Sequence, residues 1–321
     1  MNSKSLVTLF AAVGLALLGA SARAQTAADP NLYFGEYSNE DVFHVSQTGT
    51  DKTTFIPGFG SGHRFSGIAF DPFGNLFVTT GGGVSGQGNE VRKFSPTGTF
   101  LGNFVTGLGL PIAVAIDSTG NAYIATSSSV NKYNAAGSLL YTLSSGLSTP
   151  SGIAFDTSGN VFVSSYGNGT IHKFSPTGAD LGIFVSGVGN TQGIAIDPFN
   201  NVFVGSRGLN NVQKFSATGA QLATYLGFND PLNLTSDSSG NIYVANYAGN
   251  AAGAGSIMKI SSAGVNLGAI TTGLTGAYGV AFRVPPTSTA AAPEPGALPL
   301  ALIGLSSLLV VRRRTALTGK V

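Results

Sequence analysis

The chain has 321 residues, no cysteine and charges on only 9% of its positions, with a formal net charge of +2. Because no disulfide is possible, an exported domain would have to be stabilised by its own buried core, and the length is ample for one. Residues 25–292 hold 10 basic and 13 acidic residues without a basic cluster, which argues against a nucleic-acid partner.

Residues 1–24 predict a secretory signal peptide. A basic start is followed by the apolar stretch Leu6–Leu18 and by the small residues Ala22 and Ala24, which form a site for signal peptidase. We expect cleavage after Ala24, which leaves residues 25–30 as a short leader. An N-terminal membrane anchor is the alternative, although the apolar stretch is short for a span.

A repeated sequence motif occupies residues 31–284. Its first half reads Gly-Ile-Ala-Phe-Asp-x-x-Gly-Asn and its second half reads Lys-Phe-Ser-x-x-Gly, and each copy holds four short runs rich in Val, Ile and Phe. The aspartates of the first halves recur at steps of 46, 39, 41 and 40 residues, at Asp71, Asp117, Asp156, Asp197 and Asp237. A repeat of about 40 residues with four strand signals predicts an all-β fold, a β-propeller with four-stranded blades.

The first and second halves of the repeat occur in different numbers, and this difference predicts how the propeller ring closes. There are five complete first halves and six second halves, and the unmatched second half is N-terminal, where residues 31–34 begin at a second strand. A matching first strand occurs at the other end, at Gly279–Phe282. The sequence therefore predicts six blades, one of them shared between the two ends, with no free inner edge.

Two columns of charged residues have structural explanations. The aspartates suit the first position of a turn closed by Gly, and ring symmetry keeps them in separate blades, so we expect turns and not a ring of metal ligands. A basic residue also recurs in the third strand, at His44, Lys93, Lys132, Lys173, Lys214 and Lys259. We expect this column to protect the outer edges of the blades. A basic belt for an anionic polysaccharide is the alternative.

Ligand contacts are expected on the face opposite the two repeated turns, where the loops vary. One column there has tyrosines and an arginine that suit stacking on sugar or peptide, and it holds Tyr37, Gly81, Ser127, Tyr166, Arg207 and Tyr247. The residues just before each first strand should reach the mouth of the channel, and none is acidic: Ser66, Ile112, Ser151, Gln192, Leu232 and Tyr278. Loop packing is the alternative for the first column.

The repeat resembles the NHL-repeat propellers and, more loosely, streptogramin-lyase-like and gluconolactonase-like propellers. The resemblance covers residues 31–284 and implies the fold, but this architecture carries many unrelated activities. A lyase-like site would need a His and Glu pair, for which Glu36 and His63 are the weak candidates, and a lactonase-like site would need carboxylates around a divalent cation. The sequence offers a complete set of residues for neither kind of site, so we expect no catalytic residue, cofactor or metal.

The C-terminal end carries three elements in order. A linker at residues 285–292 comes before a Pro-Glu-Pro motif, which is formed by Pro293, Glu294 and Pro295. An apolar run at residues 296–311 follows, and then an arginine cluster of Arg312, Arg313 and Arg314. Residues 293–315, with the tail 316–321 behind them, resemble the PEP-CTERM sorting signal of Gram-negative bacteria that make exopolysaccharide. The resemblance implies membrane retention and cleavage near the motif by an exosortase.

Physical reasoning supports the membrane part separately. Sixteen apolar residues rise roughly 24 Å as a helix, a thin crossing with arginines at its cytoplasmic end. An ordinary tail anchor is the alternative to a sorting signal.

Together these features predict an exported propeller, held transiently in the inner membrane and then found at the cell surface or in the extracellular matrix. We expect a non-enzymatic binding or scaffold module whose partners are polysaccharide or envelope proteins. A divalent-metal-dependent lactonase or streptogramin-lyase-like enzyme is one alternative, and an envelope protein–protein scaffold is another.

Overall fold

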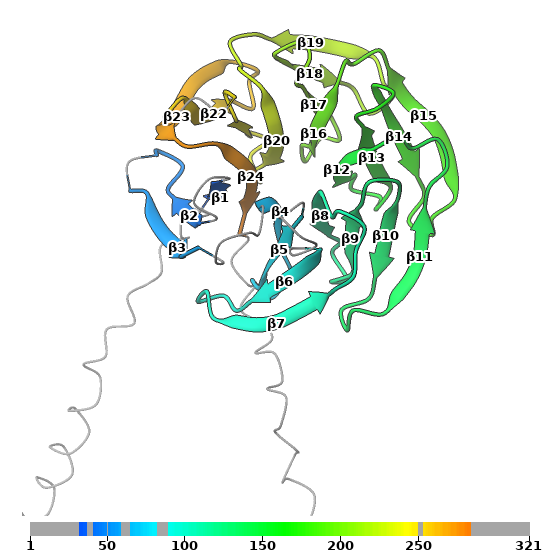
Figure 1. The fold of residues 1–321 in the computed structure, drawn as a ribbon. Coiled ribbons are helices and arrows are strands. Elements are labelled where there is room, and N and C mark those ends of the chain that lie inside the picture. The colour runs from blue at the N-terminus through cyan, green and yellow to red at the C-terminus, as the bar shows by residue number, and fades with distance from the viewer. Residues whose placement is uncertain are drawn as a thin grey trace, which may run out of the picture. The chain divides into compact units, whose positions relative to one another are not determined.

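The computed structural model describes residues 32–36, 41–49, 51–58, 65–81, 89–249 and 253–283. These residues form six antiparallel sheets of four strands each. Figure 1 looks along the axis of the ring and shows the sheets arranged as blades around a centre. The all-β fold and the six four-stranded blades are therefore confirmed.

In every blade the strands follow one another outward from the axis. Blade 1 has the order β24 (Ala277–Phe282), β1 (Leu32–Glu36), β2 (Val42–Val45) and β3 (Thr53–Ile56). Blades 2 and 3 hold β4 (Phe65–Phe70), β5 (Leu76–Thr80), β6 (Glu90–Phe94), β7 (Phe100–Val105), β8 (Ala113–Ile116), β9 (Ala122–Ala125), β10 (Val130–Tyr133) and β11 (Leu139–Leu143). Blade 4 holds β12 (Pro150–Phe155), β13 (Val161–Ser165), β14 (Thr170–Phe174) and β15 (Asp180–Ser186). Blades 5 and 6 hold β16 (Thr191–Ile196), β17 (Val202–Ser206), β18 (Asn211–Phe215), β19 (Gln221–Tyr225), β20 (Pro231–Ser236), β21 (Ile242–Asn246), β22 (Gly255–Ile260) and β23 (Asn266–Leu274).

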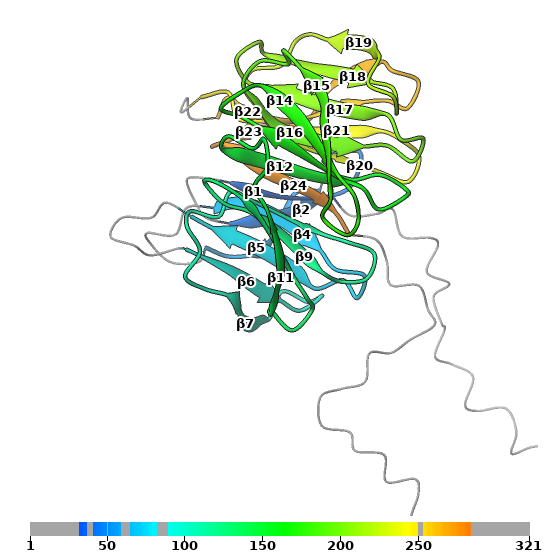
Figure 2. The same cartoon turned by 90° about the vertical axis from the view of Figure 1, so that its right-hand side faces the viewer.

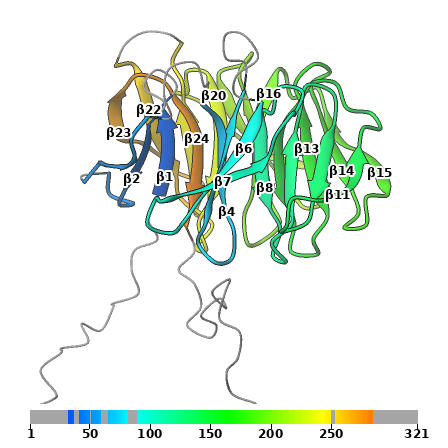
Figure 3. The same ribbon diagram turned by 60° about the horizontal axis from the view of Figure 1, so that its bottom comes forward.

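The ring closes through the shared blade, as the sequence predicts. Strand β24 lies beside β1, with Leu32 opposite Phe282 and Phe34 opposite Val280 (Figure 3). The C-terminal strand thus supplies the innermost position of the N-terminal blade. Among the described residues there is no helix long and apolar enough to cross a membrane. The expected signal peptide and the segment at residues 293–315 lie outside the described residues.

The hydrophobic core lies between neighbouring blades. Tyr123 and Val130 of blade 3, for example, pack in one buried cluster with Val163 and Phe174 of blade 4. The second strands are buried on both faces because each blade is covered by a neighbour on either side.

Adjacent first strands approach one another closely around the axis. A Cβ added to Gly152 would lie 2.6 Å from the carbonyl oxygen of Gln192, and one added to Gly193 would lie 2.7 Å from the Cα of Asn233. Both contacts are with the backbone of the next first strand, so no side chain can be inserted there without moving a blade. Glycine at this register therefore sets the distance between those blades.

The repeated aspartates form turns, as predicted. The carboxylate of Asp71 accepts hydrogen bonds from the backbone N–H groups of Phe73 and Asn75 and from the side-chain amide of Asn75. Gly74 closes the turn at φ +82°, and in the fourth copy Asn200 does so at φ 64°. The same bonds recur at the other four turn aspartates.

The predicted role of the lysine column as edge protection is wrong, because the third strand is an interior strand of each blade. Each lysine instead lies over the aromatic ring directly opposite it on the second strand, as Lys93 does over Phe77 at 4.9 Å from the ring centroid. Lys132 also lies 3.4 Å from the carboxylate of Asp117. The column therefore joins the turn aspartates to the aromatic core.

The outer edges are interrupted by β-bulges. In blade 2, Lys93 pairs with Gly102 and Phe94 with Phe100, so Leu101 is an extra, unpaired residue. The other complete blades skip a leucine at the same place, and these leucines are 50–56% exposed: Leu140, Leu181, Leu222 and Leu267. A bulge disrupts the ladder and discourages pairing with another strand, which is the protection that the lysines do not provide.

The strands cross the thickness of the ring, which therefore has two different faces (Figures 2 and 3). One, the turn face, carries eleven tight turns of the described residues, all closed by Gly or Asn. Five of them start at the aspartates and six at Ser46, Ser95, Asn134, Ser175, Ser216 and Ser261. The opposite loop face carries the links from second to third strands and from blade to blade.

Replacing Gly193 by Ala should destabilise the ring, because the new Cβ meets the backbone of β20. We expect a loss of about 1–3 kcal/mol, the usual cost of overpacking, and a melting temperature lower by several degrees. Thermal unfolding followed by circular dichroism measures it. Gly109→Ala is the control, since nothing lies within 4 Å of a Cβ there. Equal melting of the two variants would contradict the close-approach constraint.

Asp117→Asn should lower stability in a pH-dependent way. Burial raises the pKa of Asp117, but hydrogen bonds from Thr119 and Asn121 together hold it below the ordinary 3.8. A lowered native pKa contributes stability that is present above about pH 3.8 and lost as the pH falls through the native value. The wild type should therefore exceed the variant in urea-unfolding midpoint at pH 7, and the difference should vanish toward pH 2. A pH-independent difference would argue against this electrostatic origin.

Candidate binding site at the mouth of the central channel

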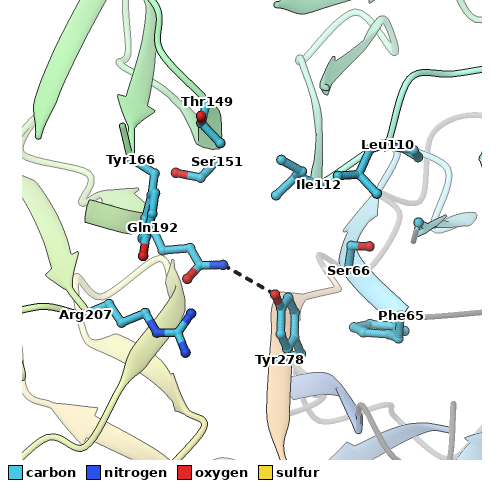
Figure 4. Close-up of a pocket in the computed structure, with 12 residues that line it drawn as sticks. Phe65, Ser66, Leu110, Ile112, Thr149, Ser151, Tyr166, Gln192, Arg207 and Tyr278 are labelled. Carbon is cyan, nitrogen blue, oxygen red and sulfur yellow. Dashed lines mark hydrogen bonds between the residues drawn. The ribbon is translucent and has the colours of Figure 1, made fainter. Parts of the chain in front are cut away.

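The loop face has a cavity of about 330 Å³ at the mouth of the central channel. Five of the six residues predicted to reach the mouth line it, namely Ser66, Ile112, Ser151, Gln192 and Tyr278. Gly81, Tyr166 and Arg207 of the predicted rim column line it as well. Figure 4 shows these side chains coming from several blades toward one space. Among the residues that the structure describes, no acidic residue lines the cavity.

A repeated backbone clamp holds the rim residues in place. The N–H group of Tyr166 donates to the carbonyl of Thr149, and that of Arg207 donates to the carbonyl of Asn190, at 3.1 and 2.9 Å. Tyr247 makes the same bond to Asp230 at 3.0 Å. In each case the residue just after the second strand is tied to the connection that enters the first strand. The rim column is therefore positioned by rigid strands and not by loose loops.

Three residues around the mouth have a strained backbone. Leu110, Thr149 and Asp230 have φ values of 52°, 52° and 61°, and each directly precedes a proline that begins or adjoins a first strand. Positive φ is costly for residues other than glycine, and most so for a β-branched residue such as Thr149. Strain of this kind gathers at functional sites, where the surrounding structure maintains it.

The cavity has a polar wall and an apolar wall. Figure 4 shows Tyr166, Ser151, Gln192 and Arg207 on one side, and Leu110, Ile112 and Phe65 on the other, with Ser66 as a single polar residue among them. The amide of Gln192 donates to the Tyr278 hydroxyl across the space at 3.4 Å. The side-chain carbonyl oxygen of Gln192 is buried and accepts no hydrogen bond from the described residues. A ligand with an apolar face and hydroxyl groups would match both walls.

Arg207 supplies the cationic group of the cavity. Its Nε lies 2.6 Å from the carboxylate of Asp230, while 43% of the Arg207 side chain stays exposed. Burial raises the pKa of Asp230 above its ordinary value, and the adjacent guanidinium opposes that rise. Asp230 thus orients Arg207 and partly neutralises it, so the wall can accept hydroxyl or carboxylate groups.

The remaining predicted site residues lie elsewhere or outside the described residues. Tyr247 is buried and packs edge-on against Tyr278, with ring centroids 5.9 Å apart, so it supports the cavity wall. Tyr37 and His63 lie outside the described residues. Glu36 is buried at the blade closure, where its carboxylate contacts Lys52 at 2.9 Å and accepts a hydrogen bond from Thr275 at 2.8 Å.

Metal ligands are not grouped in the part of the chain that the structure describes. No three His, Cys, Asp or Glu side chains there come together in a way that could hold an ion. Asn233 lines a second cavity of about 200 Å³ between the first strands, together with Thr235 and mostly apolar residues. It occupies the register that is glycine in four other blades, deeper in the channel than the mouth.

Sequence reasoning missed the lining residues Phe65, Leu110, Pro111 and Thr149. All lie at or just before the start of a first strand. The signal available was the proline next to Leu110 and Thr149, which marks a constrained entry into a strand. The positive φ values themselves leave no sequence pattern beyond that.

The fold defines this protein as a six-bladed β-propeller. The beta-propeller repeat family SBBP matches residues 138–171, which run from β11 into β14. No curated protein matches the chain significantly in sequence. The NHL-type repeat stays a prediction.

Solved structures share this fold at low sequence identity. A chain of a nidogen/laminin complex is 18% identical with a TM-score of 0.66, over 79% of this chain and 98% of that one. A protein of unknown function from Bacteroides caccae is 15% identical with a TM-score of 0.63, over 80% and 100%. A streptogramin B lyase is 15% identical with a TM-score of 0.57, over 74% and 78%. At these identities the likeness shows the fold alone.

Glu36→Ala should weaken the closure of the ring, because it leaves Lys52 and Thr275 without their carboxylate partner. We expect a loss of about 1–3 kcal/mol and a lower midpoint in thermal or denaturant unfolding. Glu90→Ala is the matched control, since Glu90 pairs with Arg92 inside one blade. If Glu36→Ala costs no more than this control, Glu36 does not contribute specially to closure.

Proposed function

We propose that this protein is an exported, non-enzymatic propeller that binds carbohydrate of the extracellular matrix at the mouth of its central channel. The observation that carries the proposal is the composition of the cavity wall. Tyr166 and Tyr278 supply aromatic rings and hydroxyl groups, Gln192 supplies a side-chain amide N–H donor, and Arg207 supplies a partly neutralised cation. Sugars are bound by this combination of aromatic surface and hydrogen-bonding groups.

The two ends of the chain support delivery to the cell surface. The signal peptide with Ala22 and Ala24 would direct export, and the apolar residues 296–311 with the following arginines would hold the chain in the inner membrane. An exosortase-type enzyme acting near Pro293–Pro295 would then release or transfer the ring to the surface or the matrix. The neutral surface, rich in Gly, Ser, Thr and Asn, suits a hydrated polysaccharide environment.

The residues that line the cavity do not support the alternative hypothesis of an enzyme. A metal-dependent lactonase or lyase needs carboxylate or imidazole groups that converge on the reacting position. Neither group is found among the described residues that line the cavity. Likeness in fold to a streptogramin B lyase does not supply them, because chemistry depends on the site.

Removing the two central polar contacts should weaken sugar binding. We expect Tyr166→Ala combined with Arg207→Ala to lower affinity about tenfold or more, the equivalent of one stacking or hydrogen-bonding contact. Calorimetric titration with polysaccharide extracted from the producing cells, as neutral and acidic fractions, measures the effect. Leu209→Ala is the control, because Leu209 is exposed on the same face but does not line the cavity.

The variant Asp230→Asn separates neutral from acidic ligands in the same titration. Asn tolerates the positive φ of this position, and the substitution removes the charge that neutralises Arg207. An acidic fraction should bind more tightly and a neutral one about equally. Absence of binding to either fraction would reject the proposal. A shift in melting temperature with Ca²⁺ or Zn²⁺ would favour the enzymatic reading, and capture of an envelope protein at the mouth would favour the scaffold reading.

A further inference from the structure

Among the described residues, two of the five aspartate turns carry a strongly exposed aromatic side chain at the tip. Phe73 and Phe199 are 52% and 70% exposed, and each is the third residue of an Asp-Pro-Phe turn. Single exposed apolar residues are common on protein surfaces. These two differ because they occupy the same position in their repeats, on turns made rigid by proline and by the aspartate hydrogen bonds. Blades 2 and 5, which carry them, lie on opposite sides of the axis (Figure 1).

The tips of the turn face carry no charge. In none of the eleven tight turns, all of which lie in the described residues, is either central residue Lys, Arg, Asp or Glu. They are Ser, Thr, Ala, Pro, Gln and Phe. The aspartates that begin five of these turns have their carboxylates engaged by backbone and Asn donors. The tips of the turns therefore offer hydroxyl groups and two phenyl rings, while the exposed carboxylate of Asp51 lies beside the Ser46 turn and accepts a hydrogen bond from the Ser46 N–H group.

The chain leaves the ring on this same face. Strand β24 ends at Phe282 directly opposite Leu32, where β1 begins, and both lie at the end of the strands that carries the aspartate turns. From there residues 284–295 can reach at most about 40 Å when fully extended. Residues 296–311 follow, which we proposed above as the membrane anchor. The link to the proposed anchor therefore starts from the turn face.

We propose that the turn face rests on the lipid bilayer surface in the anchored protein, with Phe73 and Phe199 inserted at the interface. Two insertion points on opposite sides of the axis would hold the ring flat. The neighbouring Ser and Thr hydroxyls can bond to head groups, while phenyl rings favour the boundary between head groups and acyl chains. The cavity at the mouth then points away from the membrane, toward the matrix. This inference rests on the proposed anchoring, and it does not depend on the identity of the carbohydrate.

The absence of tryptophan from the chain allows a direct test. The full chain is reconstituted in vesicles of phosphatidylcholine and phosphatidylglycerol, with and without dibrominated phosphatidylcholine as a quencher. Phe73→Trp and Phe199→Trp each introduce one reporter on the turn face. Leu209→Trp is the matched control, because Leu209 is 52% exposed, like Phe73, but belongs to the loop face. Vesicle flotation is measured on the same samples.

We expect the indole of Phe73→Trp and of Phe199→Trp to emit at shorter wavelength in vesicles and to lose intensity with brominated lipid, while Leu209→Trp shows neither change. Equal quenching of all three reporters, or of none, in chains that float with the vesicles would overturn the proposed orientation and leave the anchor intact. A chain that does not float would overturn both the anchor and this orientation. The sugar titration of the preceding subsection would be unaffected, so the failures are distinguishable.

Discussion

The closeness with which neighbouring first strands pack around the axis determines the rest of this ring. At Gly152 and Gly193 the backbone of one strand meets the backbone of the next with no room for a side chain. Hydrophobic packing between blades is not directional, so it favours contact without setting one angle or radius. The glycine register sets that radius, and the aromatic and β-branched residues of the second strands fill the wider space further out. Ala113 and Asn233 replace glycine at two places, and the ring accommodates a Cβ there.

The same register places the candidate binding site. In five of the six blades the residue just before the close-approach position lines the mouth, which is why Ser151, Gln192 and Tyr278 meet although they are far apart in the sequence. Geometry is repeated from blade to blade while the side chain at the equivalent position changes. A backbone clamp that recurs at Tyr166, Arg207 and Tyr247 repeats in the same way, yet two of these side chains line the cavity and one supports its wall. The candidate site therefore differs from blade to blade in its side chains, while the backbone geometry stays the same.

The two faces of the ring differ in charge and in shape. The loop face holds the cavity and the Arg207–Asp230 pair, whereas the turn face has uncharged tips and turn aspartates whose carboxylates are already bonded. The lysines of the third strands lie over aromatic rings within the blades, so they add little positive charge to either face. A ligand at one face and a bilayer at the other would not compete for the same surface. This separation suits a module that meets both membrane and matrix.

By itself the sequence determined the number of blades, the shared blade and the turns, because these follow from the spacing of the repeat and from the local chemistry of Asp, Asn and Gly. It also indicated five of the residues that line the mouth, since a known strand register places them. Only the tertiary structure decided that Tyr166 lines the cavity while Tyr247 packs behind it, that Asp230 partners Arg207, and that Glu36 joins the two ends of the chain. Those outcomes depend on contacts between segments distant in the sequence, and a repeat pattern carries no information about which side chains will meet across blades.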